Sequence, residues 1–201
     1  MTAWPFGDLP LMHYRCILAD PPWRFVAGGD RGAREHYDVL TVEQIAALPV
    51  GNLCAGDCAL FLWVTNPLLP RAFEVMAAWG FEFKTVAFTW AKTRRKHDTA
   101  EIGPKDWHMG LGFWTRSNTE MCLLATRGRP QILTHDVRQL VVAPLREHSR
   151  KPAQVHEGIE RLVAGPRLEL FGREKRADWA VWGLETDKFS DADRAAAPAS
   201  V

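Results

Sequence analysis

The sequence contains no GxGxxG pattern, so it gives no support to a dinucleotide site of the nicotinamide type. It also has no apolar run near the roughly 20 residues that a membrane-spanning helix needs. The first ten residues, MTAWPFGDLP, lack the basic segment followed by an apolar one that marks a secretory signal. The four cysteines, Cys16, Cys54, Cys58 and Cys122, have neither the paired spacing of a zinc site nor the pattern of a disulfide framework. We therefore expect a cytoplasmic protein in a reducing compartment, with no bound metal and no membrane contact.

An excess of charge of one sign is missing as well. The chain has 25 Lys and Arg residues against 24 Asp and Glu, a net charge of +1, so any surface for nucleic acid must be local. What the chain does have is 47% hydrophobic and 24% charged residues among its 201 positions, an ordinary globular composition. A chain of this length is expected to fold as one domain with a substantial core.

Apolar runs of strand length alternate with helical patterns along the chain. Strands are expected at 15–19, 58–65, 81–93, 120–128, 138–144, 167–173 and 179–185. Helices are expected at 41–48, 66–80 and 149–165. Thr41 and Gln44 fit a capping box, and Asn66 is expected to cap the second helix. This alternation predicts an α/β domain with a mostly parallel sheet. Residues 94–113 have no convincing periodicity, and their length indicates a functional or mobile loop.

The stretch LADPPWRF, residues 18–25, places a carboxylate at the end of a buried strand. Pro21 and Pro22 directly follow Asp20. Because each proline removes a hydrogen-bond donor and fixes φ, neither a strand nor a helix can continue there. In open α/β sheets, ligands bind at the carboxyl ends of the strands. A solvated Asp-Pro turn would explain the same residues, so the stretch alone leaves both interpretations open.

Four motifs in order, ADPPW, LFLWVT, REHSRKP and ELFGR, resemble the DPPW-type N6-adenine methyltransferases. That family includes the catalytic subunit of the eukaryotic mRNA N6-adenosine methyltransferase and shorter bacterial and phage DNA-modifying relatives. The resemblance implies a Rossmann-like fold that depends on S-adenosylmethionine, with a permuted motif order: the catalytic motif is N-terminal and much of the cofactor site is C-terminal. It predicts an N-terminal extension at 1–13, a methyltransferase domain at 14–185 and a flexible tail at 186–201.

The resemblance gives the DPPW residues a catalytic role. The exocyclic N6 of adenine is a poor nucleophile because its lone pair is delocalised into the ring. Asp20 and the carbonyl of Pro21 would accept hydrogen bonds from this amino group and aim the lone pair at the methyl donor. Pro22 adds rigidity, and such positioning is worth roughly several kcal/mol of barrier. Trp23 would stack on the base, a contact worth about 1–3 kcal/mol; a core aromatic is the alternative.

Two segments are expected to bind the adenosine part of the cofactor. By resemblance, Glu169 lies near the ribose hydroxyls, which suits an acceptor carboxylate, while Phe171 and Arg173 line the adenosine pocket. The alternative for Glu169 is a solvent-facing residue on an edge strand. Leu184 stands where the family typically has asparagine, and Glu185 keeps the polar character of the next position. One ribose contact is therefore expected to be missing.

The methionine part of the cofactor is expected at the segment EHSRKP, which precedes a helix. Free N–H groups at a helix start bind carboxylates. By resemblance, Ser149, Arg150 and Lys151 approach this part, and Asp20 also borders the cofactor. Family members often have histidine where Arg150 stands. Without the resemblance, these residues would be an ordinary helix cap.

Basic and aromatic residues are interleaved between positions 92 and 114, a mixture that suits a phosphate backbone and an unstacked base. The expected nucleic-acid contacts are Lys92, Arg94, Arg95, Lys96 and Trp107, with Lys105 and Trp114 nearby. A solvated charged face is the alternative. By resemblance, Tyr37 lies in a loop that gates the substrate. His108 has no second metal ligand at suitable spacing, so a zinc site is rejected.

Taken together, these features predict transfer of a methyl group from S-adenosylmethionine to N6 of adenine in DNA. The alternatives are N6-adenosine methylation of RNA and a catalytically silent nucleic-acid-binding partner subunit. No additional nucleic-acid module is recognisable, which favours the bacterial or phage DNA-modifying kind. A monomer or a homodimer is expected, with a partner subunit as a further option.

Overall fold

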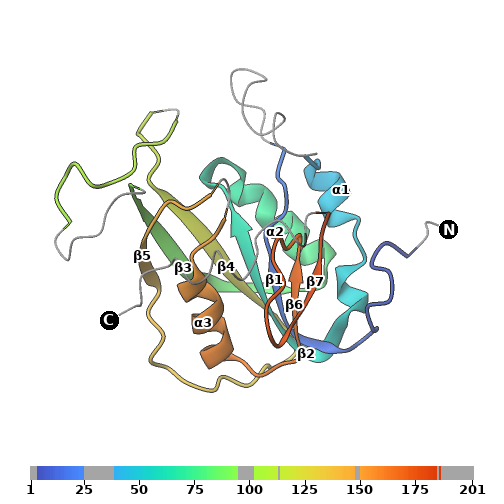
Figure 1. Ribbon diagram of the computed structural model, residues 1–201. Coiled ribbons are helices and arrows are strands. Elements are labelled where there is room, and N and C mark those ends of the chain that lie inside the picture. Colours follow the sequence, from blue (N-terminus) through green and yellow to red (C-terminus); the bar gives the residue numbers. More distant parts are fainter. Residues whose placement is uncertain are drawn as a thin grey trace.

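The structure of the protein, a computed structural model, describes residues 4–24, 39–94, 102–112, 114–147, 150–184 and 186. Its centre is one sheet of seven strands (Figure 1), in the order β5-β3-β4-β2-β1-β6-β7. The strands are β1 (Tyr14–Ala19), β2 (Cys54–Val64), β3 (Glu82–Thr93), β4 (Thr119–Arg127), β5 (Leu140–Pro144), β6 (Arg167–Leu170) and β7 (Trp179–Trp182). Each expected strand is present, with boundaries that differ by a few residues.

The strands are mostly parallel. The pairs β1–β2, β1–β6, β3–β5 and β6–β7 are parallel, whereas both pairs made by β4 are antiparallel. Among the described strands, β4 alone therefore runs against its neighbours. Its first residues lie at the edge where the neighbouring strands end, because Glu120 pairs with Trp90 and Met121 with Val64. The predicted α/β class with a mostly parallel sheet is confirmed.

Helices cover both faces of the sheet (Figure 1). Helices α1 (Val42–Ala46) and α2 (Leu69–Ala78) lie on one face, and α3 (Ala153–Leu162) lies on the other. Successive side chains of a strand point to opposite faces, and β1 accordingly supplies both cores. Its Ile17 packs in the core under α1 and α2, while its Leu18 packs with Val155 and Ile159 of α3. Two buried faces explain why β1 and β2 read as continuous apolar runs.

The helix boundaries follow local chemistry. The capping box of α1 is confirmed: the Thr41 hydroxyl accepts from the Gln44 N–H, and the Gln44 side-chain oxygen accepts from the Thr41 N–H. The predicted Asn66 cap is wrong, because Asn66 begins a short 3₁₀ turn and α2 starts only at Leu69. In the same way, α3 begins later than residue 149. Its N-cap is Pro152, in an extended conformation that ends the preceding loop.

Residues before β1 also pack on the sheet. Phe6 is buried, with its ring 4.9 Å from that of Trp182 at the end of β7. The Trp182 indole N–H donates to the Pro5 carbonyl.

Within the described part of the chain, no helix has the length and apolar character needed to cross a membrane.

Candidate active site

Asp20 directly follows β1, at the edge where the parallel strands end. Its backbone N–H donates to the Leu170 carbonyl at the end of β6. The Pro21 carbonyl accepts the Trp23 N–H at 2.8 Å and keeps its second lone pair. The Pro22 carbonyl accepts the Leu40 N–H at 2.9 Å. The turn that carries the Asp20 carboxylate is thus held by hydrogen bonds on both sides.

Trp23 is packed into the core rather than presented as an open platform. Trp23 is 7% exposed, and its indole N–H donates to the Trp63 carbonyl at 2.9 Å. In this conformation its rings contribute to the core beside α1 and α2. Stacking of Trp23 on a target base stays a prediction that requires the ring to become accessible.

Four charged side chains of alternating sign meet beside this turn. The Lys151 ammonium lies 2.8 Å from Asp20 Oδ2 and 3.1 Å from Glu120 Oε1, and the Lys92 ammonium lies 2.8 Å from Glu120 Oε2. Their side chains are between 10% and 19% exposed. The Lys151 ammonium also lies 5.2 Å from the centre of the Trp63 ring. Each buried charge therefore has a partner of opposite sign, as burial of charge requires.

Burial and pairing pull the pKa values of these groups in opposite directions. Burial raises the pKa of Asp20, and the nearby Glu120 adds to this, although Lys151 opposes it. For Glu120, burial is outweighed by Lys151 and Lys92, which lower its pKa. For Lys151, burial alone would lower the pKa, but the two carboxylates raise it. The site therefore contains a firmly charged ammonium between two carboxylates.

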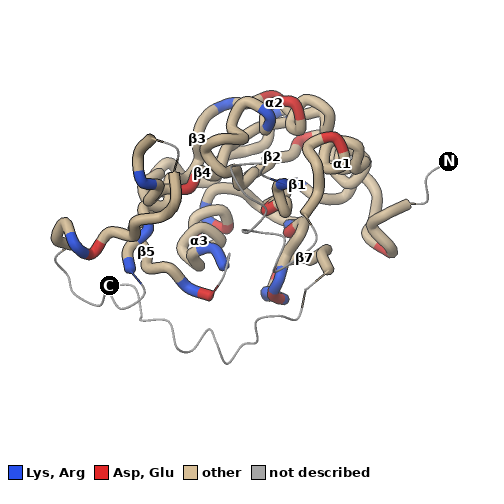
Figure 2. The backbone as a smooth tube through the Cα atoms, turned by 90° about the horizontal axis from the view of Figure 1, so that it is seen from above, with Lys and Arg blue, Asp and Glu red and all other residues tan. Residues whose placement is uncertain are grey.

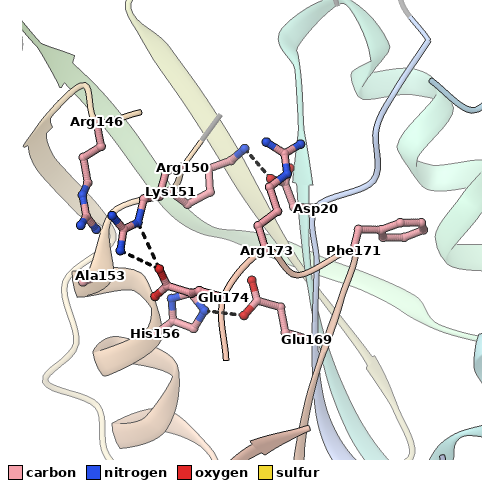
Figure 3. Close-up of a pocket in the computed structure, with 10 residues that line it drawn as sticks. All are labelled: Asp20, Arg146, Arg150, Lys151, Ala153, His156, Glu169, Phe171, Arg173 and Glu174. Carbon is pink, nitrogen blue, oxygen red and sulfur yellow. Dashed lines mark hydrogen bonds and ion pairs between the residues drawn. The ribbon is translucent and has the colours of Figure 1, made fainter. Parts of the chain in front are cut away.

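A pocket opens next to Asp20, between α3 and the end of β6 (Figure 3). It is lined by Asp20, Arg146, Arg150, Lys151, Ala153, His156, Glu169, Phe171, Arg173 and Glu174. All the described residues expected to bind the cofactor, from Asp20 to Arg173, are brought together here. The other two, Ser149 and Glu185, lie outside the described residues. Leu184 is 92% exposed, so it takes no part in the core.

Arg150 forms ion pairs that link two segments lining this pocket. Its Nε and Nη2 lie 3.1 and 2.7 Å from Glu174 Oε2, and Nη1 lies 3.3 Å from Glu147 Oε2. Its side chain is only 4% exposed. Figure 3 shows the guanidinium of Arg150 reaching from the segment before α3 to Glu174 in the loop after β6. The ion pair links the segment expected at the methionine part to the loop expected at the adenosine part.

The expected nucleic-acid residues are divided by the structure. Lys92 is engaged with Glu120 and lies 4.7 Å from the Trp90 ring centre, inside the charged network. Arg94 is exposed, and Trp107 is half-buried and bridges to Thr93. Trp114 is fully exposed. Tyr37, Arg95 and Lys96 lie outside the described residues.

The surface charge is mixed (Figure 2). Acidic and basic positions are interspersed over the backbone, in keeping with a net charge of +1.

His108 lies near Lys92 and Arg94, and burial together with these cations lowers its pKa. The described residues contain no group of three or more His, Cys, Asp or Glu side chains that could hold a metal ion.

Sequence reasoning missed Glu120 and His156 as members of the site. Glu120 lies near the start of β4, directly before an apolar run, and a charged residue at that place was the available signal of a site residue. Only the reversed direction of β4 brings it to the edge that carries Asp20. His156 lies on the buried face of the amphipathic helix α3, where a lone polar residue among apolar ones was the signal.

A helix-covered, mostly parallel sheet defines an α/β protein with a Rossmann-like fold, and its candidate site lies at the carboxyl ends of the strands, beside a charged pocket. Comparison with known families then identifies the kind of enzyme. The MT-A70 family matches residues 14–185, and the chain belongs to this methyltransferase family.

Individual relatives include both bacterial and eukaryotic methyltransferases. The chain is 31% identical to the type II methyltransferase M.MunI of Mycoplasma sp, over 90% of this chain and 81% of that protein. It is 30% identical to the human N(6)-adenosine-methyltransferase catalytic subunit METTL3, over 87% of this chain and 28% of that protein. It is 29% identical to the MT-A70-like N(6)-adenosine-methyltransferase of Drosophila melanogaster, over 90% and 28%. The chain thus spans most of M.MunI but less than a third of the adenosine methyltransferases.

Proposed function

We propose that the protein transfers the methyl group of S-adenosylmethionine to the N6 amino group of adenine in DNA. The observation that carries this proposal is the Asp20 carboxylate, fixed at the end of β1 by two prolines and bordering the charged pocket. A carboxylate and a backbone carbonyl on a rigid turn suit an amino group that must be held in one orientation.

In the proposed reaction, Asp20 and Pro21 orient the amino group. Lys151 occupies Oδ2 of Asp20, which leaves Oδ1 to accept a hydrogen bond from N6, and the Pro21 carbonyl accepts the second one. Bound S-adenosylmethionine would supply a methyl group on a positively charged sulfur, which would keep the electron pair of the broken carbon–sulfur bond. The methylated amino group would release its extra proton to solvent, so Asp20 serves as a hydrogen-bond acceptor and need not be a strong base.

The lining of the pocket supports the cofactor assignment. Glu169 suits the ribose hydroxyls, Phe171 offers an apolar ring, and Arg173 adds a donor at the same wall. Lys151 and Arg150 put positive charge where the carboxylate of the methionine part would lie. The catalytic carboxylate of Asp20 would then precede the cofactor residues in the chain, which is the permuted order that the motifs predict.

DNA is the proposed substrate because the chain spans 81% of a type II methyltransferase. In a duplex, the target adenine must first be flipped out of the stack, at a cost of about a few kcal/mol. The likeness to METTL3 is the observation that favours RNA as a second candidate. A silent partner subunit is a poorer fit, since the DPPW turn and the pocket beside it are both intact.

A direct methylation assay tests the proposal. The purified protein is incubated with S-adenosylmethionine and duplex DNA, single-stranded DNA or RNA of matched sequence, and the nucleosides are analysed by mass spectrometry. We expect N6-methyldeoxyadenosine from DNA, formed at least about a hundredfold more slowly by the Asp20→Asn variant. Methylation of RNA alone would replace DNA by the second candidate. Cofactor binding without methylation of any substrate would point to the silent partner.

A further inference from the structure

His156 is a buried polar residue in the first turns of α3, and none of the roles proposed above uses it. It is 7% exposed, and its Nε2 lies 3.0 Å from Glu169 Oε2 on β6. Figure 3 shows its ring pointing from the helix across the pocket wall toward that carboxylate. An ionised carboxylate only accepts hydrogen bonds, so the contact with such a carboxylate is made by the His156 tautomer in which Nε2 carries the proton and donates.

The ring of His156 is itself held in place. It meets the Trp179 ring edge to face, with centres 5.3 Å apart and planes at 76°. The Trp179 indole N–H donates to Glu160 Oε1 at 2.8 Å, one turn further along α3. Helix α3 and strand β7 therefore fix the position from which His156 donates.

Glu169 is confined on its other side by a glycine. A Cβ on Gly172 would clash with a Val181 methyl at 2.5 Å and would crowd Glu169 Cγ at 3.2 Å. The Glu169 side chain is 12% exposed. With Oε2 held by His156, Oε1 is the oxygen left to face the pocket.

We propose that His156 is a positioning residue that orients Glu169 toward the ribose hydroxyls of the methyl donor and thereby sets selectivity for ribose over deoxyribose. This inference rests on the proposed function. A carboxylate with free rotation would meet a diol in several poses, whereas one oxygen anchored by His156 leaves a single pose. Selectivity for the hydroxyl, rather than the chemical step, is therefore the property that His156 controls.

The test compares S-adenosylhomocysteine with its 2′-deoxyribose analogue by calorimetric titration. A hydrogen bond to a charged group predicts that the wild type binds the ribose form about ten- to hundredfold more tightly. His156→Phe keeps a ring against Trp179 but removes the donor, and the preference should fall below about threefold. His156→Gln retains an N–H donor and should keep most of the preference. His135→Phe, at an exposed loop position, is the matched control and should behave as the wild type.

Two further measurements separate positioning from general damage. In steady-state assays, His156→Phe should raise the KM for S-adenosylmethionine about tenfold while kcat at saturating cofactor stays within about twofold. If His156→Phe does not fold, His156→Ala is titrated with and without added imidazole, which should restore part of the preference.

The outcomes distinguish this inference from the proposed function. If Glu169→Gln abolishes the ribose preference but folded His156→Phe, or His156→Ala without imidazole, keeps it, the positioning role is overturned while the cofactor site stands. If the wild type binds neither ligand, the cofactor site itself fails.

Discussion

Replacing Lys151 by methionine should shift the pH dependence of methyl transfer toward higher pH. Methionine keeps the length of the side chain but removes the ammonium that lies 2.8 Å from Asp20 and 3.1 Å from Glu120. An ionised Asp20 accepts a hydrogen bond from the amino group more strongly than a protonated one, so activity should rise with pH through the pKa of Asp20. Burial and Glu120 already raise that pKa, and Lys151 is the main group that opposes them.

The size of the shift follows from the geometry of the pair. Two unit charges 4 Å apart interact by about 4 kcal/mol at an effective dielectric constant of about 20, which corresponds to about three pKa units. The Asp20 side chain is 19% exposed, so solvent reduces this value. An opposite charge at such distances typically lowers an aspartate pKa by about 1–3 units. Its removal should therefore move the acidic limb of the profile upward by about 1–3 pH units.

The assay is methyl transfer from labelled S-adenosylmethionine to duplex DNA, with kcat/KM measured from pH 5 to 9. Lys92→Met is the matched control: Lys92 contacts Glu120 but not Asp20, so its acidic limb should move by less than about half a unit. A folded Lys151→Met protein whose profile overlays that of the wild type would refute the reasoning.

The same substitution should destabilise the fold in a pH-dependent way. Removing one partner of a buried ion pair typically costs about 3–5 kcal/mol because a buried charge is left uncompensated. In Lys151→Met the folded-state pKa of Asp20 lies further above its unfolded value. Stability is then lost as pH rises from the unfolded to the folded pKa, so urea denaturation should show a larger deficit at pH 8 than at pH 5.

Three other predictions concern single parts of the site. Asp20→Asn should lower kcat by at least about a hundredfold with a much smaller change in cofactor affinity, because the negative charge is lost and one of the two acceptor oxygens becomes an NH2 donor, while Lys151 keeps Glu120 as a partner. Near-normal turnover would remove Asp20 from the catalytic assignment. Arg94→Ala combined with Lys105→Ala should reduce the salt slope of duplex-DNA binding by up to about two. Arg15→Ala, near the start of β1 and so at the opposite end of the strands, should leave the slope unchanged. Equal slopes for all three proteins would mean that Arg94 and Lys105 only face solvent. If one ribose hydrogen bond is missing, Leu184→Asn should tighten S-adenosylmethionine binding by roughly two- to tenfold in calorimetric titration. Leu184 is 92% exposed, so the substitution removes no core packing. Equal or weaker binding by the variant would therefore contradict the missing contact.

Local patterns were sufficient to predict most of the architecture. The central strands β1 and β2 contain apolar runs with both faces buried, and such runs are visible without tertiary information. The position of Asp20 was predictable for the same reason, because two prolines end β1 whatever surrounds it. The α1 capping box depends on side chains three residues apart, so it too could be read locally.

The rest depended on contacts between distant segments. The direction of β4 is not encoded in its apolar run, and without it nothing brings Glu120 near Lys151, which is 31 positions later. Burial of Trp23 depends on the Trp63 carbonyl, forty positions away. The Asn66 prediction failed because a 3₁₀ turn intervenes between Asn66 and α2.

The reversed strand has a consequence for how such an enzyme can change its target. Because β3 ends and β4 begins at the same edge, paired at Ala91 and Thr119, the connection between them leaves the sheet and returns to it beside the charged network. The cofactor pocket shares Asp20 and Lys151 with this network, but the rest of its lining comes from β6, α3 and the segments next to them. The described part of the β3–β4 connection is also attached to the end of β3, where Trp107 pairs with Thr93 and the His108 N–H donates to the Lys92 carbonyl. Transplanting it from a relative would test whether preference for the bases around the adenine can be altered while affinity for the methyl donor is kept.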